Sequence, residues 1–461
     1  MTENLSSIPA VARNELRQLV CKQLQILLDE GNLQGAKALL VPVQPVDIAD
    51  AIEGLDESKQ AIAFRLLSKA EAIEVYEHLD STVQQALIQK FKHQEVLDIV
   101  DQMSPDDRAK LFDELPAKVV RRLLSQLSAK ERQVTALLLG YEEDTAGRIM
   151  TPEYISLREA LTVSQALDRI RSLANVSEII YYLYVTDNSR QLTGIVSLRD
   201  LVISAPDKTL TEIATRDVVY VHTNTDQEEV ARLIQRYDLL ALPVVDREQR
   251  LVGVVTVDDV LDILEEEATE DIYALGGVQS DGDNYFQINL LAVARKRVLW
   301  LLVLLGTNTI TSEIINRNSA LLQQVVALAA FIPLLTGTGG NVGAQSSTVI
   351  IRGLNTDEIR DLGKARVIFR EALAGLLLGA LLGIMATAYF SLQQEFSVAL
   401  SVGISLVAIS LLASVAGSAL PFLFDSFGLD PALMSAPFIT TAVDVIGVLI
   451  YFNIARTMLG L

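Results

Sequence analysis

The chain of 461 residues carries a formal net charge of −20, with 50% hydrophobic and 6% aromatic residues. This length predicts about three domains. Because Cys21 is the only cysteine, an internal disulfide and a cysteine-based metal cage are excluded, which fits a reducing compartment. The acidic excess argues against nucleic acid as a partner and favours cations.

The acidic residues are unevenly distributed. Before residue 293 there are 49 acidic and 28 basic residues, whereas residues 293–461 contain 9 acidic and 10 basic ones. This second part has apolar runs that, at about 1.5 Å per helical residue, can cross the roughly 30 Å hydrocarbon core of a bilayer. The first ten residues do not resemble a secretory signal peptide. We therefore expect a multidomain protein with an acidic cytoplasmic part and a domain embedded in a lipid bilayer.

Residues 1–140 are predicted to form an acidic domain of consecutive short α-helices. Leu111, Leu115 and Val119 follow helical spacing, and Ser-Pro-Asp-Asp at 104–107 is a helix start signal. Related patterns recur along this part, which favours a small α-helical superhelix whose repeat period the sequence leaves open.

Residues 141–268 contain an internal duplication, with repeats at about 149–204 and 213–268. Seven positions recur at one constant offset: Leu183, Val185, Asp187, Leu192, Gly194, Val196 and Asp200 match Leu242, Val244, Asp246, Leu251, Gly253, Val255 and Asp259. Each half is predicted to run helix, strand, turn, strand, helix. The halves resemble the paired cystathionine-β-synthase (CBS) modules that regulate many channels and enzymes, so we expect an α/β CBS pair.

In CBS modules, a Gly-x-x-Ser/Thr-x-x-Asp run often binds an adenosine ribose through its hydroxyl and its carboxylate. The resemblance implies ATP or another adenosine nucleotide as a candidate ligand at Ser197, Asp200 and Thr256. The alternative is that these side chains only cap a strand-to-helix turn. The sequence leaves both interpretations open.

A dense acidic stripe follows the duplication. It holds eight carboxylates within fourteen residues: Asp258, Asp259, Asp262, Glu265, Glu266, Glu267, Glu270 and Asp271. Four of them, Asp259, Asp262, Glu266 and Glu270, share one face of a helix. A solvated helix is the simplest interpretation. Because the stripe leads through a connecting region at 269–297 to the membrane domain, we favour a site for Mg²⁺ or Ca²⁺, which take oxygen ligands. Further candidate ligands are Asp226, Glu228 and Asp238.

Residues 298–461 are predicted to form an α-helical pore domain with five membrane spans, near 298–315, 322–345, 371–391, 397–424 and 433–455. Basic residues precede the first span and fill the loop between the second and third: Arg295, Lys296, Arg297, Arg352, Arg360, Lys364, Arg366 and Arg370. The positive-inside rule therefore places the amino terminus in the cytoplasm. Five spans then place the carboxyl terminus outside the plasma (inner) membrane.

Two features of the spans suggest an ion path. Asp444 lies about 10 Å into the last span, where a carboxylate is costly unless it faces water, an ion or a partner. At the end of the second span, four glycines predict an irregular or polar backbone that lines a cavity, a close helix contact, or both together in a dimer: Gly337, Gly339, Gly340 and Gly343.

Three long motifs occur in this order of domains: "TAGRIMT" at 145–151, "TGTGGNVGAQSS" at 336–347 and "DPALMSAPFITTAVDVIG" at 430–447. With them the chain resembles the MgtE family of magnesium channels. The resemblance implies a homodimeric pore lined by the second and fifth spans, in which Asp444 holds a largely hydrated Mg²⁺. The sequence departs from some members at Ala436, where they carry Asn.

The resemblance also implies a regulatory role for the transported ion. Cytoplasmic Mg²⁺ would bind between the CBS pair, the connecting helix and the inner ends of the spans, and hold the pore closed. The implied ligands are Asp226, Glu228, Asp238, Asp259, Asp262, Glu267, Glu270, Asp271 and Asp430. Asp106, Asp107 and Asp113 are further candidates that the resemblance does not align. Cations that bind only the closed form can shift a two-state gate.

Two alternatives remain open from the residues alone. The cargo could be Ca²⁺, Mn²⁺ or Co²⁺, because carboxylates do not fix the metal. The chain could also be a membrane-anchored sensor of adenosine nucleotides. An enzyme is not predicted, because His78, His93 and His222 are scattered and no nucleophile and base pattern or phosphate loop is present.

Overall fold

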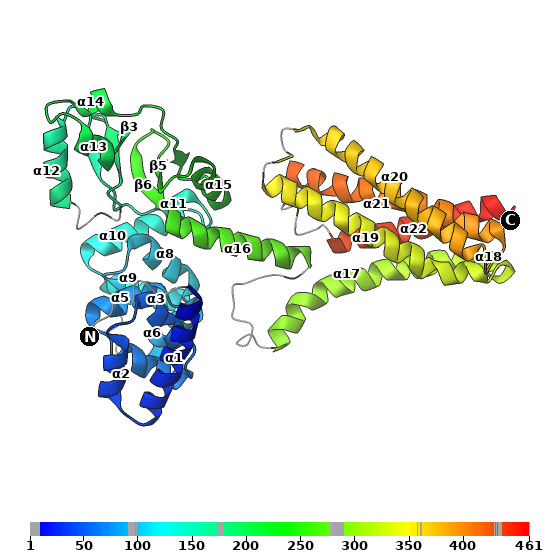
Figure 1. Cartoon of the computed structure of the whole chain (residues 1–461), viewed down its shortest axis with the longest axis horizontal. Helices are drawn as coiled ribbons and strands as arrows, with labels where there is room; N and C mark the ends of the chain where they lie inside the picture. Colours follow the sequence, from blue (N-terminus) through cyan, green and yellow to red (C-terminus); the bar gives the residue numbers. More distant parts are fainter. Residues whose placement is uncertain are drawn as a thin grey trace. The chain divides into compact units, whose positions relative to one another are not determined.

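The computed structural model describes residues 10–90, 97, 99–173, 177, 179–276, 278, 290–356, 358–359, 362–427, 429, 431 and 436–460. Its contacts divide the chain into two units, Met1–Glu265 and Glu266–Leu461. The first contains short helices and two small sheets, and the second contains long helices (Figure 1).

Short helices form the first part of the first unit: α1 (Ala10–Asp29), α2 (Leu33–Leu40), α3 (Pro45–Glu53), α4 (Glu57–Phe64), α5 (Lys69–Glu77), α6 (Ser81–Lys90), α8 (Pro105–Glu114), α9 (Ala117–Gln126) and α10 (Ala129–Leu138). Five of them, α2, α4, α6, α8 and α10, begin at evenly spaced positions, namely 33, 57, 81, 105 and 129. The predicted helical domain is confirmed, and this even spacing supplies the repeat period that the sequence left open.

Each repeat is tied to the next in the same way. A carboxylate of one repeat accepts a hydrogen bond from the backbone N–H at the start of the following one: Glu53 from Asp80 (2.7 Å), Glu77 from Ser104 (3.4 Å) and Asp101 from Ser128 (2.8 Å). Beside these three bonds the apolar side chains of Leu79, Met103 and Leu127 are buried, and Leu55 is buried at the equivalent position of the preceding repeat. Burial and hydrogen bonding therefore recur together along the domain.

Arg108 on α8 joins the last two repeats. Its side chain is fully buried. Nε donates to Thr135 Oγ1 (2.8 Å) and Nη2 to Glu131 Oε2 (2.5 Å), both on α10, while Nη1 donates to the carbonyl of Val100 (3.1 Å). A buried guanidinium is tolerated only with such partners. Because they come from α10 and from the turn before α8, these helices move as one body.

The rest of the first unit is the CBS pair. Its elements are α11 (Ala146–Ile149), β1 (Ser156–Arg158), α12 (Val163–Leu173), β2 (Tyr182–Thr186), β3 (Leu192–Ser197), α13 (Leu198–Ile203), α14 (Leu210–Ile213), β4 (Val221–His222), α15 (Gln227–Tyr237), β5 (Ala241–Val245), β6 (Leu251–Thr256) and the start of α16 (Val257–Leu275). The two sheets have the same order, β1-β2-β3 and β4-β5-β6, each with one parallel and one antiparallel pair.

The two halves of the CBS pair are equivalent and bond to each other. β5 and β6 follow β2 and β3 at the offset that the sequence predicted. The hairpin turns then pair across the halves, since Leu192 N–H donates to the carbonyl of Gln249 (3.2 Å) and Leu251 N–H to that of Arg190 (3.1 Å). The predicted duplication and its α/β class are confirmed.

The second unit contains the end of α16 and the long helices α17 (Leu290–Arg317), α19 (Ala327–Asn355), α20 (Lys364–Phe390), α21 (Phe396–Ser426) and α22 (Ala436–Leu459), with the short α18 (Ser319–Gln324). Helices α19 to α22 lie side by side (Figure 1). The connecting region expected at 269–297 begins within α16, which runs without a break from the second CBS repeat. Residues 277 and 279–289 lie outside the described part.

Four helices, rather than the five predicted, are long and apolar enough to span a membrane in the described residues: Ala327–Asn355, Lys364–Phe390, Phe396–Ser426 and Phe438–Leu459. The span predicted at 298–315 lies within α17, a continuous helix. Its apolar stretch after Arg297 soon gives way to Thr307, Asn308 and Thr309, which shortens the apolar segment. The crossing of the membrane by α17 therefore stays a prediction.

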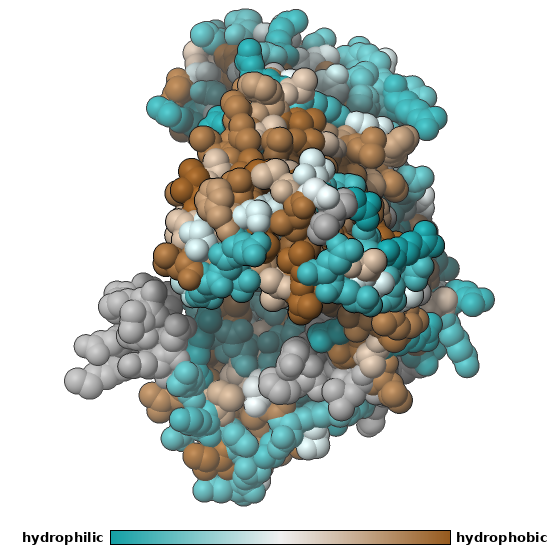
Figure 2. Space-filling view, turned by 90° about the vertical axis from the view of Figure 1, so that its right-hand side faces the viewer, coloured by the Kyte–Doolittle hydropathy of each residue, from teal (hydrophilic) through white to brown (hydrophobic). Residues whose placement is uncertain are grey.

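The second unit exposes apolar side chains, as a membrane domain should. Leu377, Leu381 and Ile384 on α20 are strongly exposed, and brown apolar side chains cover much of the face drawn in Figure 2. Exposed apolar surface on this scale is unusual for a protein in water. It fits contact with lipid chains.

Helices α20 and α21 approach closely through glycine. Gly375, Gly379 and Gly383 line the contact face of α20, and a Cβ at Gly379 would lie 2.8 Å from Cα of Val407 and 3.1 Å from its carbonyl oxygen. Both atoms belong to the backbone of α21, so a side chain at Gly379 requires the helices to separate.

Gly379→Leu is therefore expected to destabilise the second unit by more than about 3 kcal/mol, measured as a lower midpoint of thermal unfolding of the full chain in detergent. Gly337→Ala is the matched control, because nothing lies within 4 Å of a Cβ at Gly337 and alanine is the better helix former. Equal midpoints for the leucine variant and the native chain would show that the close contact does not contribute.

Candidate functional site

Helix α8 presents two acidic residues at its start. Ser104 caps the helix by accepting the N–H of Asp107, and Pro105 occupies the first position. Asp106 and Asp107 follow in the first turn, which is the favoured place for carboxylates on a helix. The sequence predicted this helix start but did not say what the two carboxylates face.

They face the beginning of α16. Burial and the nearby carboxylate of Asp106 raise the pKa of Asp259 to about 8, against the lowering effect of a hydrogen bond from the Thr256 hydroxyl. Burial likewise raises the pKa of Asp107, with added repulsion from Asp258 and Asp262. We name these five residues, Asp106, Asp107, Asp258, Asp259 and Asp262, the acidic layer. It joins two elements that are far apart in the chain.

The acidic layer fits a divalent cation by its chemistry. All five donors are carboxylates, which suit Mg²⁺ or Ca²⁺, and their mutual repulsion would be relieved by positive charge. Within the described residues, no group of three or more His, Cys, Asp or Glu side chains is arranged to hold a metal ion.

Glu77 adjoins the layer and titrates near neutral pH. Burial, followed by the charge of Asp107, raises the pKa of Glu77 to about 7, against the lowering effect of the Ser104 N–H. The folded state thus binds more protons than the unfolded state between about pH 4.5 and 7. Stability contributed by Glu77 is full below this window and is lost as the pH rises through it.

In EDTA, the native chain is therefore expected to lose stability between pH 5 and 8, and Glu77→Gln is expected to lose less, by about 1–2 kcal/mol after allowance for partial solvation. The measurement is the thermal midpoint of the full chain at several pH values. Glu30→Gln, an exposed position just after α1, is the control. A Glu77→Gln profile parallel to the native one would contradict the assignment.

Three other predicted cation ligands lie on helix α15 or at its two ends in this structure. Asp226 caps the helix by accepting the N–H of Glu228 (2.9 Å), and Glu228 pairs with Arg232 (2.5 Å). Asp238 ends the helix in a left-handed conformation (φ 51°). Cation binding by these three carboxylates stays a prediction.

The last turns of α16 contact the end of α19 within the second unit. Asn355 Nδ2 donates to Asp271 Oδ2 (2.5 Å), and Ala274 packs with Ile351. Glu267 is half-buried and Glu270 is exposed. Asp430, also predicted as a ligand, lies outside the described residues. One helix therefore carries the acidic layer at its start and a contact to α19 at its end.

The predicted nucleotide residues form local caps. The Ser197 hydroxyl donates to Asp200 (2.6 Å) and accepts its N–H (3.0 Å). The Thr256 hydroxyl donates to Asp259 (2.5 Å) and is buried. Both pairs show the capping geometry. Burial makes Thr256 the weaker nucleotide candidate, whereas Ser197 and Asp200 stay partly exposed.

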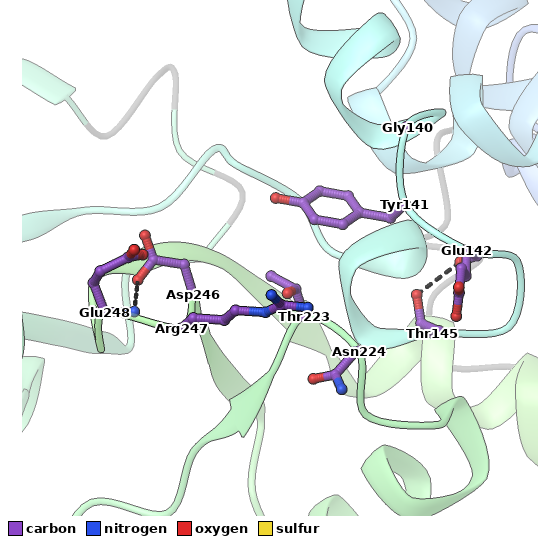
Figure 3. Close-up of a pocket in the computed structure, with 9 residues that line it drawn as sticks. All are labelled: Gly140, Tyr141, Glu142, Thr145, Thr223, Asn224, Asp246, Arg247 and Glu248. Atoms are coloured by element: carbon purple, nitrogen blue, oxygen red, sulfur yellow. Dashed lines mark hydrogen bonds between the residues drawn. The ribbon is translucent and has the colours of Figure 1, made fainter.

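A cavity of about 500 Å³ opens where the linker after α10 meets the second CBS repeat (Figure 3). Its lining consists of Gly140, Tyr141, Glu142, Thr145, Thr223, Asn224, Asp246, Arg247 and Glu248. Burial and the charge of Asp246 raise the pKa of Tyr141. The sequence predicted no site here, and one arginine among three carboxylates leaves the lining net acidic.

Asp444 lies on α22, half-buried, and no ion pair engages it among the described residues. One turn earlier, Thr440 contacts α19, where a Cβ at Gly340 would lie 2.8 Å from its Cγ2. Gly343 is equally close to Ile439. These glycines provide the close helix contact predicted from the sequence.

The alternative of an irregular backbone at the glycines is wrong, because α19 is continuous from Ala327 to Asn355. Pro333 and four glycines are accommodated within it. Neighbouring helices hold the segment, so the low helix propensity of glycine does not break it. The contact places α19 beside Asp444.

The chain matches known proteins over most of its length. A family model described as a divalent cation transporter matches residues 332–454, one described as the MgtE intracellular N domain matches 43–144, and CBS domain models match 146–206 and 210–266. The chain is 41% identical over 448 residues to the magnesium transporter MgtE of Thermus thermophilus, covering 96% of this chain and 99% of that protein.

The chain is also 34% identical over 439 residues to the magnesium transporter MgtE of Bacillus subtilis, covering 94% of this chain and 96% of that protein. A solved structure, the cytosolic domain of the Mg²⁺ channel MgtE in complex with ATP, matches 53% of this chain and 99% of its own, with 40% identity and a TM-score of 0.51. Matches to metabolic enzymes cover 18–26% of this chain and involve only the CBS pair.

Proposed function

Because the chain belongs to the MgtE family of magnesium transporters, we propose that it is a Mg²⁺ channel whose gate closes when cytoplasmic Mg²⁺ binds the acidic layer. The family is not enzymatic. The observation that supports regulation is the position of Asp106 and Asp107 near Asp259, whose pKa both carboxylates raise, and of Asp258 and Asp262 near Asp107, whose pKa they raise in turn.

Repulsion within the acidic layer provides the opening force. Two carboxylates about 6 Å apart repel by about 3 kcal/mol at an effective dielectric of 20. Bound Mg²⁺ supplies the positive charge that lets α8 and α16 stay together. Moving a gate from 1:99 to 99:1 needs about 5.5 kcal/mol of differential binding, which several such carboxylate pairs can supply together.

Helix α16 offers a direct route to the pore. Asp259 and Asp262 lie in its first turns, and its last turns contact α19 through Asp271 and Ala274. A rigid helix transmits a displacement at one end to the other. Glu267, Glu270 and Asp271, with Asp430 at the start of the last span, are proposed as further ligands near that contact.

The proposed pore runs along α19 and α22, with Asp444 as its cation site. A single carboxylate per subunit suits Mg²⁺ that stays largely hydrated, and a homodimer would bring two such carboxylates to one axis. Asp226, Glu228 and Asp238 are proposed to complete the regulatory sites. The soluble part is proposed to face the cytoplasm, with the carboxyl terminus outside the plasma membrane.

A nucleotide is proposed at Ser197 and Asp200. Support comes from the CBS duplication and from the ATP complex of the related cytosolic domain. Binding of ATP to the full chain, measured by calorimetry, should weaken when Asp200 is replaced by Asn. Unchanged binding would exclude this location.

Current through a planar bilayer that contains the full chain tests the channel. With low Mg²⁺ on the side of the soluble part, we expect Mg²⁺ current, which millimolar Mg²⁺ added to that side alone suppresses. Ca²⁺ as a competitor tests the cargo. Absence of current would contradict conduction, and current that persists at millimolar Mg²⁺ on the side of the soluble part would contradict the gate.

The sensing step can be tested separately by limited proteolysis of the full chain in detergent. Cleavage near 258–285 is expected to slow as Mg²⁺ rises, because neutralised carboxylates can pack. Cleavage that is the same at all Mg²⁺ concentrations would remove the sensing claim and leave conduction untouched.

A further inference from the structure

Arg148 lies on α11, the first helix of the CBS pair, and its side chain contacts the helical domain. Its guanidinium binds Asp113 on α8 with two hydrogen bonds, Nε to Oδ2 (2.8 Å) and Nη2 to Oδ1 (2.5 Å). Nη1 donates to the carbonyls of Leu138 (3.2 Å) and Tyr141 (3.1 Å) at the end of α10. One side chain thus holds α8 and α10 to the linker.

The geometry of this contact is specific for arginine. The Arg148 side chain is only 10% exposed, so its charge needs these partners. A two-pronged bond to a carboxylate requires the planar fork of a guanidinium, and lysine cannot reproduce it together with two carbonyl contacts. Exposed ion pairs contribute little, but here the guanidinium is largely shielded from water, while Asp113 stays partly exposed.

The linker around Arg148 is itself bonded to the second CBS repeat. Ala146 N–H donates to the carbonyl of Thr225 (2.7 Å) and Gly147 N–H to that of Thr223 (2.9 Å). A Cβ at Gly147 would lie 2.7 Å from the Tyr141 ring. Figure 3 shows Tyr141 and Thr145 beside Thr223 in this region. Arg148 is therefore held in place by the CBS pair.

Helix α8 connects this contact to the acidic layer. Asp113 lies six residues after Asp107, about 9 Å along the helix. One end of α8 is attracted to Arg148, and the other end faces like charges on α16. Since Arg108 makes α8 and α10 one body, the contact with Asp113 fixes the whole end of the helical domain.

We propose that Arg148 is a positioning residue for cation sensing: its contact with Asp113 holds the helical domain on the CBS pair so that the acidic layer stays assembled. This inference rests on the proposed regulation by Mg²⁺. Without the contact, bound cations must oppose more of the repulsion within the layer. More Mg²⁺ is then needed to assemble it, and the gate closes at a higher concentration.

The test is the Mg²⁺ concentration that gives half-maximal protection of residues 258–285 from protease in the full chain. Arg148→Gln and Asp113→Asn are each expected to raise it about 5- to 20-fold, with full protection still reached at high Mg²⁺. Arg148→Lys is expected to behave like the glutamine variant. A general loss of stability would lower protection at every concentration instead.

Two further variants complete the experiment. Exchange of the charges, Asp113→Arg with Arg148→Asp, is expected to recover part of the shift, because the ion pair returns without the bonds to Leu138 and Tyr141. Arg171→Gln is the matched control, since Arg171 pairs with Asp168 on the exposed face of α12 (2.8 Å), and it should leave the midpoint unchanged.

The outcomes separate this inference from the function it rests on. If the protection of the native chain does not change with Mg²⁺ concentration, the proposed sensing and this inference are both overturned. A second outcome is that Mg²⁺ protects the native chain and that the Arg148→Gln and Asp113→Asn variants have the same midpoint. This outcome overturns the role of Arg148 alone. If Arg148→Gln does not fold, Asp113→Asn decides, because Arg148 keeps its two carbonyl contacts in that variant.

Discussion

Replacing Asp444 by asparagine is expected to reduce Mg²⁺ current at least 10-fold. A carboxylate attracts a divalent cation about 4.5 Å away by about 2 kcal/mol at the dielectric of water and by several times more at an effective value of 20. A difference of about 1.4 kcal/mol is a factor of ten in occupancy. Asparagine keeps the size and removes this attraction, so hydrated Mg²⁺ would no longer concentrate at this depth.

The measurement is single-channel or macroscopic current in lipid bilayers at equal protein density. Glu313→Gln is the matched control, because it removes one carboxylate from an exposed pair with Arg317 (2.8 Å) on α17. Thermal midpoints of both variants should equal that of the native chain. Native-like current in Asp444→Asn would place the cation path elsewhere in the membrane domain.

Of the two repeats in the fold, the CBS duplication could be predicted from the sequence. The CBS duplication was visible because seven identical or similar residues recur at one offset, and the strands β2, β3, β5 and β6 follow that offset. The repeat of the helical domain was hidden. Each repeat keeps only a buried apolar residue followed by a polar residue before the next helix. These two are Leu79 and Asp80 in one repeat and Met103 and Ser104 in the next.

The acidic layer was only half predictable. The helical face with Asp259 and Asp262 follows from spacing alone, and Asp106 and Asp107 were recognised as a helix start. Their meeting depends on the packing of α8 against the CBS pair, and a single sequence carries no signal for contacts over such a distance. Likewise, Arg148 stood inside a recognised motif, but nothing in the motif pointed to Asp113.

The glycines of α19 show why a composition signal can mislead. Four glycines near a proline predict a weak helix by propensity, and the sequence therefore allowed an irregular backbone. In the structure, Gly340 and Gly343 face Thr440 and Ile439 of α22, so packing between helices outweighs propensity. The same contact brings α19 next to the helix that carries Asp444.

Asp259→Asn is expected to remove most of the dependence of the current on cytoplasmic Mg²⁺. Asp259 has a raised pKa because it is buried among other carboxylates. Above about pH 8, where Asp259 is ionised, its loss weakens the repulsion that opens the layer and also the attraction for the cation that closes it. Since a ligand shifts a gate only by its differential affinity for the two states, the ratio of current at low and at millimolar Mg²⁺ should approach one.

The matched control is Asp207→Asn, the same change at an exposed position between α13 and α14. It should keep the native ratio. A shift of the Mg²⁺ midpoint with the full ratio retained would assign Asp259 a minor part in binding and transfer the main role to Asp107 or Asp262. Because asparagine can still accept the Thr256 hydroxyl, a changed ratio reports the charge of Asp259 rather than a lost helix cap.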